Sequence, residues 1–422
     1  MTAANGDQAP PTRLARKLGV GDAIVVGLGS MIGAGVFSAV GPAARAAGNA
    51  VTLSLIVAGG LAYCNATSSA TLAAIYPESG GAYVYGRRRL GPFWGFLAGW
   101  AFVVGKVASC AAMALTFGHY VWPTLTRPLA IVVVAALTAV NCFGIRKTLG
   151  ATRILLALVI AALGITVWAM LAGGSPSAAE LWPFDATGPR AVLRGAGLLF
   201  FAFAGYARIA TLGEEVIDPA RTIPRAIPIA LGITLLIYAT VIVSALAAVS
   251  ADLLAFSPAP LADAVELGRF ASLAVVVRIG AAVASLGVLL SLIVGVSRTT
   301  FAMAAARDLP AWLDAVHPKY RVPYRAEIAI GAAVIALVAV LDVSRAIGFS
   351  SFAVLVYYAV TNASALTLPR DGRRRARPIA VLGLVGCIAV ATSLPGAAVV
   401  TGAIVLAAGA ALFAIRRFTS SA

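Results

Sequence analysis

The sequence predicts an all-α protein that crosses a membrane about twelve times. Of its 422 residues, 61% are hydrophobic and only 11% are charged, whereas a soluble domain carries about a quarter charged residues. The apolar residues form a series of segments close to the roughly 20 residues that a helix needs to cross a bilayer. Most Lys and Arg residues fall in the short gaps between these segments. Together these features exclude a soluble enzyme and a disordered chain.

The apolar segments follow one another with short polar connections, and each is expected to form one membrane-spanning helix. They comprise residues 20–42, 51–75, 92–119, 128–145, 154–173, 191–213, 226–250, 270–303, 326–342, 347–368, 378–394 and 397–415. The longest connections on one side of the membrane are 173–190 and 250–268. On the other side, residues 306–325 contain Trp312 and several charges, which favours a short helix at the membrane surface.

The distribution of Lys and Arg predicts the orientation of these helices. Of the 32 basic residues, 23 lie on the side of the N-terminus, seven lie on the opposite side, and Lys106 and Arg208 lie within segments. Basic residues accumulate on the cytoplasmic side, so both termini are expected in the cytoplasm and the protein in the cell membrane. Arg87–Arg89 and Arg373–Arg375 are expected to act as topology signals, with contact to anionic lipids as a by-product. The net charge of +16 does not indicate nucleic-acid binding, because no soluble domain carries it.

No pattern in the sequence indicates a catalytic or metal centre. Four cysteines (Cys64, Cys110, Cys142 and Cys387) lie in or at the ends of apolar segments without metal-binding or redox spacing, and His119 and His317 are far apart. Intramembrane His, Asp and Glu are nearly absent, which argues against a membrane-embedded enzyme. The sequence also lacks a soluble ligand-binding domain and a repeated pore motif, which argues against a sensor or a channel. We expect no metal and no cofactor.

The first apolar segment contains four glycines within nine residues, at Gly27, Gly29, Gly33 and Gly35. In a continuous helix each would cost about 1 kcal/mol relative to Ala. Close helix packing explains a pair four residues apart, such as Gly29 and Gly33. It explains Gly33 and Gly35 less well, because these two point to different faces. A break in a membrane helix is tolerated only beside a cavity or a ligand. We therefore favour a broken helix, with packing as the alternative.

A second candidate break lies in the sixth segment, where Ala204 and Gly205 are surrounded by aromatic residues between Phe200 and Tyr206. The first and sixth segments occupy matching positions in two five-segment halves. Interruptions at matching positions are typical of the midplane binding site of a transporter.

Four motifs resemble the amino acid–polyamine–organocation (APC) transporter superfamily. They are Gly29–Phe37, Tyr76–Tyr83, Phe201–Gly205 followed by Glu214-Glu215-Val216 and Ile223–Ile227, and Ser297–Met303 with Asp308–Pro310. The resemblance covers residues 18–370 and implies a core of two inverted five-helix repeats, 18–173 and 190–370, with helices 1 and 6 broken. Residues 1–17 would form a cytoplasmic tail, and 371–422 two peripheral helices with a cytoplasmic C-terminus. The implied function is secondary transport of amino acids by alternating access.

The resemblance also implies a binding site for a zwitterion at the two breaks. Backbone N–H groups of the first break would hold the substrate carboxylate, and carbonyls of the sixth would hold its ammonium group, as the helix dipoles favour. The first set maps to Ser30, Met31, Ile32, Gly33, Ala34 and Gly35, and the second to Phe201, Phe203, Ala204 and Gly205.

The sequence departs from the APC pattern after the sixth-segment glycine. Many relatives carry an acidic residue there, whereas this chain reads Tyr206-Ala207-Arg208. We therefore expect a neutral amino acid, with Phe201, Phe203 and Tyr206 shaping an apolar pocket; a cationic amino acid or polyamine remains the alternative. Arg208 is expected either to form a gate or structural ion pair with Glu214 and Glu215, or to contact the substrate. Glu214 and Glu215, together with Arg221 and Arg225, are expected either to form a closing network or to be solvated surface charges.

Lys106 lies in the middle of the third segment, too far from both interfaces for its side chain to reach them. A charge there costs about 2.5–3.5 kcal/mol or more unless it is paired, hydrated or neutralised. We expect Lys106 to act in coupling, as a fixed cation in place of sodium or as a proton carrier. Transport would then be independent of sodium and either proton-coupled or exchanging. The specific amino acid, the direction of transport and the oligomeric state do not follow from the sequence.

Overall fold

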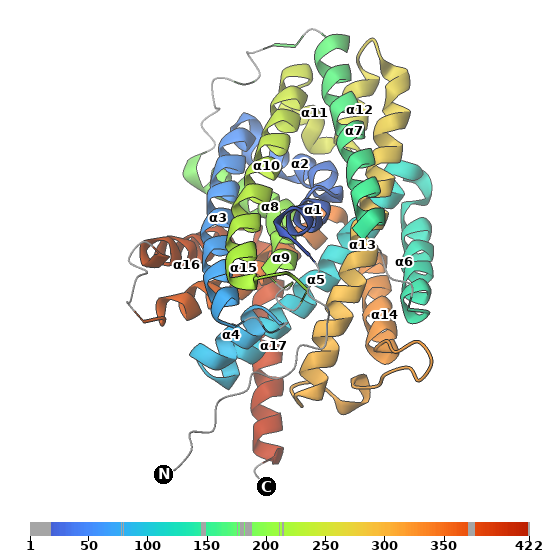
Figure 1. The fold of residues 1–422 in the computed structure, drawn as a ribbon. Helices are drawn as coiled ribbons and strands as arrows, with labels where there is room; N and C mark the ends of the chain where they lie inside the picture. Colours follow the sequence, from blue (N-terminus) through green and yellow to red (C-terminus); the bar gives the residue numbers. More distant parts are fainter. Residues whose placement is uncertain are drawn as a thin grey trace, which may run out of the picture.

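The computed structural model describes residues 18–76, 78, 80–144, 149–174, 176–177, 181, 188–210, 212, 215–369 and 376–420. In this part of the chain the regular structure is helical, apart from one isolated bridge between Leu18 and Val216. Nine of the described segments are long and apolar enough to cross a membrane, and shorter apolar helices accompany them. The polytopic all-α membrane fold predicted from the sequence is confirmed (Figure 1).

Each predicted segment coincides with a helix or with a pair of helices. The first is divided into α1 (Val20–Met31) and α2 (Ala34–Ala47), and the sixth into α8 (Gly188–Phe203), the 3-10 turn η4 (Ala204–Tyr206) and α9 (Ala207–Ala210). The others are α3 (Val51–Ile75), α5 (Pro92–Val121), α6 (Thr126–Cys142), α7 (Leu149–Gly173), α10 (Pro219–Ala248), α13 (Ala274–Ala305), α14 (Tyr324–Val340), α15 (Val343–Leu366), α16 (Ala376–Ser393) and α17 (Gly396–Ser420).

Some helices begin several residues before the apolar segment that predicted them, because start signals can be polar or proline. The side chain of Asp342 accepts a hydrogen bond from the backbone N–H of Arg345 and caps α15. Helix α10 begins at Pro219, whose fixed φ suits the first turn of a helix. Hydropathy alone does not detect either signal.

The connections contain the short helices α4 (Ala82–Arg89), α11 (Ala251–Phe256) and α12 (Pro260–Glu266), and the 3-10 turns η1 (Gly48–Ala50), η2 (Pro123–Leu125), η5 (Ala271–Leu273) and η6 (Ala311–Leu313). Connection 250–268 is therefore not an exposed loop: Leu254 in α11 and Leu261 in α12 are fully buried. Trp312 lies in the single turn η6, which replaces the short helix expected at the membrane surface.

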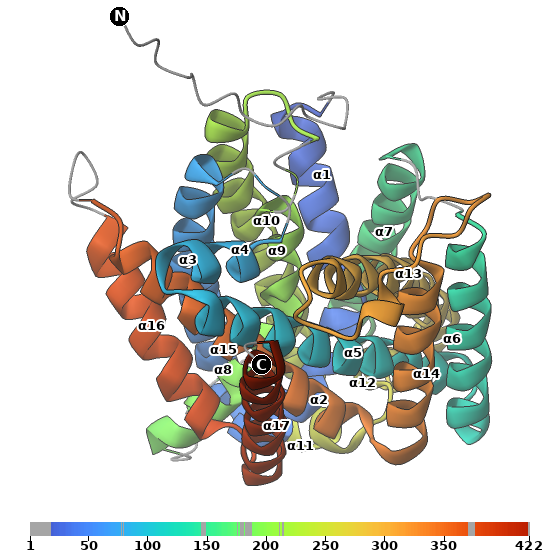
Figure 2. The same cartoon turned by 90° about the horizontal axis from the view of Figure 1, so that it is seen from below.

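The two broken helices lie inside the bundle, and α16 and α17 lie outside it. Helix α2 packs against α8, α1 against α10, and α5 against α13 and α15, whereas α16 covers α3 and α15. Figures 1 and 2 both place α16 at one edge and α6, α7 and α14 at the opposite edge, with α1 between them. We name the two ends of the bundle by their short helices: the α4 end and the α11 end, which also carries α12.

Candidate functional site

The first predicted helix break is present. Helix α1 ends at Met31 and α2 starts at Ala34, with non-helical backbone at Ile32 (φ −78°, ψ 66°) and Gly33 (φ −122°, ψ −145°). Neither φ is positive, so the glycine at 33 is explained by contact. A Cβ atom on Gly33 would lie 2.1 Å from Cγ2 of Val288, and one on Gly35 would lie 2.8 Å from Cα of Ala202. The glycines therefore serve both a break and close packing.

The break changes which backbone N–H groups are available. Ser30 and Met31 belong to α1, where N–H groups bond to carbonyls four residues earlier. The N–H of Ile32 donates to the carbonyl of Leu28 (2.6 Å) and that of Gly33 to the carbonyl of Met31 (2.8 Å). The first N–H groups of a helix have no acceptor within that helix. In this conformation those groups belong to the first turn of α2, which begins at Ala34.

The second break is also present, and it touches the first. Helix α8 ends at Phe203, and one 3-10 turn, η4, leads into α9. A Cβ atom on Gly205 would lie 2.2 Å from the carbonyl oxygen of Ser30 and 2.8 Å from the backbone nitrogen of Met31. Only a residue without a side chain allows the two backbones to approach this closely. Gly205 therefore brings the two breaks together.

A tyrosine from a third helix holds both breaks. Tyr238 in α10 is 1% exposed, and its hydroxyl donates to the carbonyl of Met31 and lies 3.2 Å from the carbonyl oxygen of Ala202. The ring of Phe203 packs edge-on against it, with centroids 5.2 Å apart. Nothing in the sequence distinguishes Tyr238 from other aromatic residues in apolar segments, so sequence analysis missed it.

A cavity of about 210 Å³ lies beside the breaks. Its base is formed by Ser30, Lys106, Ala204 and Gly205, and it extends along α13 toward the α4 end. On α13, Ser291, Arg298 and Ala302 are exposed and line this space, which shows that the cavity is open to solvent. The two breaks are thus reached from the α4 end.

Lys106 is the charged side chain at the base of the cavity. It lies in the middle of α5 and is 7% exposed. Its Nζ donates to the carbonyl of Ala204, in the second break, over 3.4 Å. Among the described residues, no carboxylate lies within ion-pair distance of it. Its ammonium group is therefore held by a backbone carbonyl rather than by an anion.

The aromatic residues that line the cavity differ from the predicted set of Phe201, Phe203 and Tyr206. All three are buried beside the cavity rather than in its lining; the ring of Tyr206 stacks on Tyr358, with centroids 5.1 Å apart. The lining contains three other aromatic residues instead: Tyr83, Phe102 and Tyr357. Phe102 and Tyr357 contact each other with ring centroids 5.3 Å apart. Sequence analysis had one usable signal for them: Phe102 precedes Lys106 by four residues and so shares its helix face.

Charged groups line the mouth of the cavity. Arg208 and Glu215 lie 3.8 Å apart on one rim, with 42% and 35% of their side chains exposed. Glu214, which was grouped with them from the sequence, lies outside the described residues. Arg221 pairs with Asp218 at the start of α10, 3.6 Å away, and Arg225 lies one turn further along that helix.

The opposite rim is fixed by a triad. The hydroxyl of Tyr83 donates to Oδ2 of Asp308 (2.7 Å), and Nη1 of Arg87 bonds both to that oxygen (3.0 Å) and to the hydroxyl (2.6 Å). Burial raises the pKa of the Tyr83 phenol well above its usual range, and Asp308 acts in the same direction. The phenol therefore remains a hydrogen-bond donor at physiological pH.

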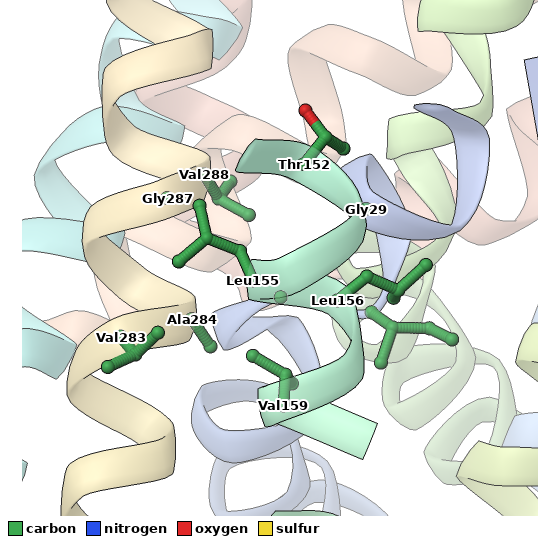
Figure 3. A pocket seen from close by; sticks show the side chains of 11 residues that line it. Gly29, Thr152, Leu155, Leu156, Val159, Val283, Ala284, Gly287 and Val288 are labelled. Atoms are coloured by element: carbon green, nitrogen blue, oxygen red, sulfur yellow. The ribbon is translucent and has the colours of Figure 1, made fainter. Parts of the chain in front are cut away.

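A second, much smaller pocket lies on the other side of the first break, between α1, α7 and α13 (Figure 3). Its volume is about 10 Å³, near the minimum of about 10–15 Å³ that a water molecule needs. Leucine and valine side chains of α7 and α13 line it, and among its described lining residues Thr152 alone carries a side-chain oxygen. Apart from backbone carbonyls, the described lining therefore offers one side-chain ligand to a cation that prefers oxygen.

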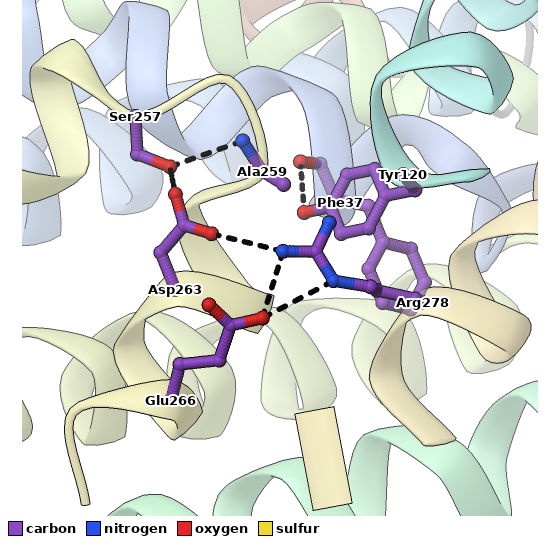
Figure 4. A network of polar contacts seen from close by, with 7 residues as sticks. All are labelled: Phe37, Tyr120, Ser257, Ala259, Asp263, Glu266 and Arg278. Carbon is purple, nitrogen blue, oxygen red and sulfur yellow. Dashed lines mark hydrogen bonds and ion pairs between the residues drawn. The ribbon is translucent and has the colours of Figure 1, made fainter. Parts of the chain in front are cut away.

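The α11 end of the bundle is closed by α11 and α12. Nε and Nη2 of Arg45, in α2, donate to the carbonyl of Ala255 (3.0 and 2.7 Å). From α13, Nη2 of Arg278 pairs with Asp263 (3.4 Å) and Glu266 (2.8 Å) of α12 (Figure 4). The short helices are thus fastened to both sides of the bundle.

Sequence comparisons identify related proteins. The family model described as amino acid permease matches residues 18–414. An uncharacterized transporter of Mycobacterium tuberculosis is 58% identical over 407 residues, covering 96% of this chain and 92% of that protein. A branched-chain amino acid permease of Bacillus subtilis is 27% identical over 335 residues, which cover 74% of this chain and 72% of that protein. Cationic amino acid transporter 7, chloroplastic, of Arabidopsis thaliana is 30% identical over 378 residues, which cover 81% of this chain and 64% of that protein.

Proposed function

Because the chain belongs to the amino acid permease family, we propose that it is a secondary transporter that carries neutral amino acids across the cell membrane by alternating access. The main supporting observation is the meeting of two helix breaks at the base of one cavity. Beside the cavity the N-terminus of α2 favours a carboxylate, and at its base the carbonyls that follow α8 favour an ammonium group. An amino acid zwitterion carries both groups.

The charges of the cavity support a neutral substrate. Its described lining includes Lys106, Arg208 and Arg298 against the single carboxylate of Glu215. A positive excess disfavours a second cation on the substrate, as in arginine or a polyamine. The apolar lining from Phe102, Val288 and Leu292 suits an aliphatic side chain. The alternative, a cationic amino acid permease, is supported by the name of the Arabidopsis relative and opposed by these charges.

Two observations support transport without sodium. The side chains that line the small pocket beside the first break are mainly apolar, and Lys106 already provides a fixed positive charge next to the second break. Coupling would then occur through protons or by exchange of one amino acid for another.

The basic residues support the orientation. Arg87, Arg88 and Arg89 lie at the α4 end, as do the arginines at the end of α17, one of which bonds to the carbonyl of Arg307. With the α4 end and both termini in the cytoplasm, the cavity faces inward in this conformation.

Uptake into proteoliposomes tests the proposal. Purified protein should accumulate labelled alanine or leucine in exchange for internal amino acid or along a proton gradient, equally well in sodium and in choline buffers. Selective transport of arginine or putrescine would establish the cationic alternative. Sodium-driven uptake would refute the proposal that transport is independent of sodium. Amino acid binding without any counterflow would indicate a sensor, and chemical conversion of the substrate an enzyme.

A further inference from the structure

We propose that the ammonium group of Lys106 occupies the backbone carbonyl that would bind the ammonium group of a substrate. Lys106 thereby restricts substrates to compounds that carry a carboxylate next to the ammonium group. The inference rests on the proposed function and names the substrate feature that the site requires. It assigns to Lys106 the role of a specificity-determining residue.

The structure itself identifies the carbonyl of Ala204 as a position that binds an ammonium group. In this structure that oxygen accepts a hydrogen bond from Nζ of Lys106. Ala204 lies in the 3-10 turn of the second break and lines the cavity base together with Lys106. A carbonyl at the end of an interrupted helix carries partial negative charge and attracts cations. A substrate ammonium group reaching the base of the cavity would seek the same oxygen.

The bond between Lys106 and Ala204 is suited to exchange. Its length of 3.4 Å exceeds the usual 2.7–3.2 Å of N–H···O bonds, so it is weak. The lysine side chain is flexible, and its ammonium group has three donors that can turn to a new acceptor. Since no described carboxylate pairs with Lys106, the ammonium group would gain from a nearby anion in this buried position.

Two ammonium groups at one carbonyl repel each other, and this repulsion produces the selectivity. An α-amino acid removes the conflict: its ammonium group takes the carbonyl of Ala204, and its carboxylate, one carbon away, accepts a charge-assisted hydrogen bond from Lys106. The corresponding amine without a carboxylate displaces Lys106 but offers it no new partner. Lys106 therefore penalises amines and favours amino acids.

Matched pairs of ligands test this on the purified full-length protein. Leucine is compared with 3-methylbutylamine, and alanine with ethylamine, by competition against a labelled amino acid. In the wild type, neither amine should compete at a hundredfold excess over its amino acid. In Lys106→Met the preference for the amino acid should fall about tenfold to a hundredfold, the range expected when a charged hydrogen bond is lost. Lys106→Arg keeps the charge and should keep most of the preference.

Ser109→Ala serves as the control for packing. Ser109 lies close to Lys106 on α5 and bonds to Ser350 of α15 (2.7 Å), but it is not part of the cavity lining. This variant perturbs the same buried helix and should leave the ratio of amino acid to amine binding unchanged.

The inference and the proposed function fail in different ways. A wild-type protein that binds amines as well as the matching amino acids would overturn the inference while leaving amino acid transport intact. An unchanged preference in Lys106→Met would also overturn it. A wild-type protein that binds no amino acid would instead overturn the proposed function.

Discussion

The hydroxyl group of Tyr238 donates a hydrogen bond to the carbonyl of Met31, the last residue of α1. The hydroxyl oxygen of Tyr238 also lies 3.2 Å from the carbonyl oxygen of Ala202, so a side chain of α10 fastens the two broken helices to each other. Both carbonyls belong to residues that are nearly inaccessible to solvent. The two breaks are therefore expected to move together rather than separately.

Tyr238→Phe should weaken substrate binding and lower stability. It removes the donor and leaves the buried carbonyl of Met31 with the N–H of Gly33 as its remaining donor, so the loss is that of one hydrogen bond, about 0.5–1.5 kcal/mol. The melting temperature in detergent and the affinity for the transported amino acid would measure the two effects. Tyr63→Phe is the matched control, because Tyr63 is 48% exposed on α3 and its substitution should change neither quantity. Wild-type affinity and stability in Tyr238→Phe would show that the bond does not hold the breaks.

Gly205→Ala should abolish transport. The new Cβ would lie 2.2 Å from the backbone carbonyl of Ser30, and backbone atoms cannot move aside as a flexible side chain can. Separation of the breaks should reduce uptake more than tenfold and destabilise the protein by about 1–3 kcal/mol. Gly232→Ala in α10, with no atom within 4 Å of the added carbon, should leave uptake unchanged. Equal activity of the two variants would refute the close approach.

Gly33→Ala should lose substrate binding, and Val288→Ala should restore it in the double variant. The added Cβ would lie 2.1 Å from Cγ2 of Val288, so removal of that methyl group creates the missing space. Affinities of the two single variants and the double variant form a cycle that measures their coupling. Absence of rescue in a folded double variant would show that Gly33 is needed for its backbone freedom rather than for packing against α13.

Arg278→Gln should make the α11 end open more often. Arg278 links α13 to Asp263 and Glu266 of α12, but these side chains are partly exposed, so each pair contributes about 0.2–1 kcal/mol. A cysteine placed at Leu261, which is fully buried, should then react about twofold to fivefold faster with a membrane-impermeant maleimide outside the cell.

The control for this prediction is Arg345→Gln. Arg345 pairs with Asp342 at the start of α15 (3.2 Å), so the variant removes an equal charge without loosening α12. Equal labelling rates in the two variants would contradict the role of Arg278. Labelling of Leu261→Cys from the cytoplasmic side alone would reverse the proposed orientation.

The helices and their breaks were predictable because each leaves a local signal. Apolar length reveals a membrane helix, and four glycines within nine residues reveal the interruption after Met31. The meeting of the two breaks at Gly205 depends on contacts between distant parts of the chain. Tyr238, which connects those parts, has no local signal of its own.

The cavity lining was harder to predict, because a break changes the direction in which the side chains beyond it point. Phe203 is the last residue of α8, and Tyr206 is the last residue of the 3-10 turn that follows. Both rings lie in the surrounding protein, that of Phe203 against Tyr238 and that of Tyr206 against Tyr358. Helices α11 and α12 were missed because each is too short to produce a periodic apolar pattern.

The closure at the α11 end has a pharmacological consequence. A compound designed to fill the cavity as it stands here enters from the α4 end, whereas the other approach is blocked by α11 and α12 and their bonds to Arg45 and Arg278. In the proposed orientation, which places the α4 end in the cytoplasm, an inhibitor of this conformation has to cross the lipid bilayer first. A charged, impermeant inhibitor applied outside would act only during turnover, and its potency would rise with the rate at which the protein is cycling.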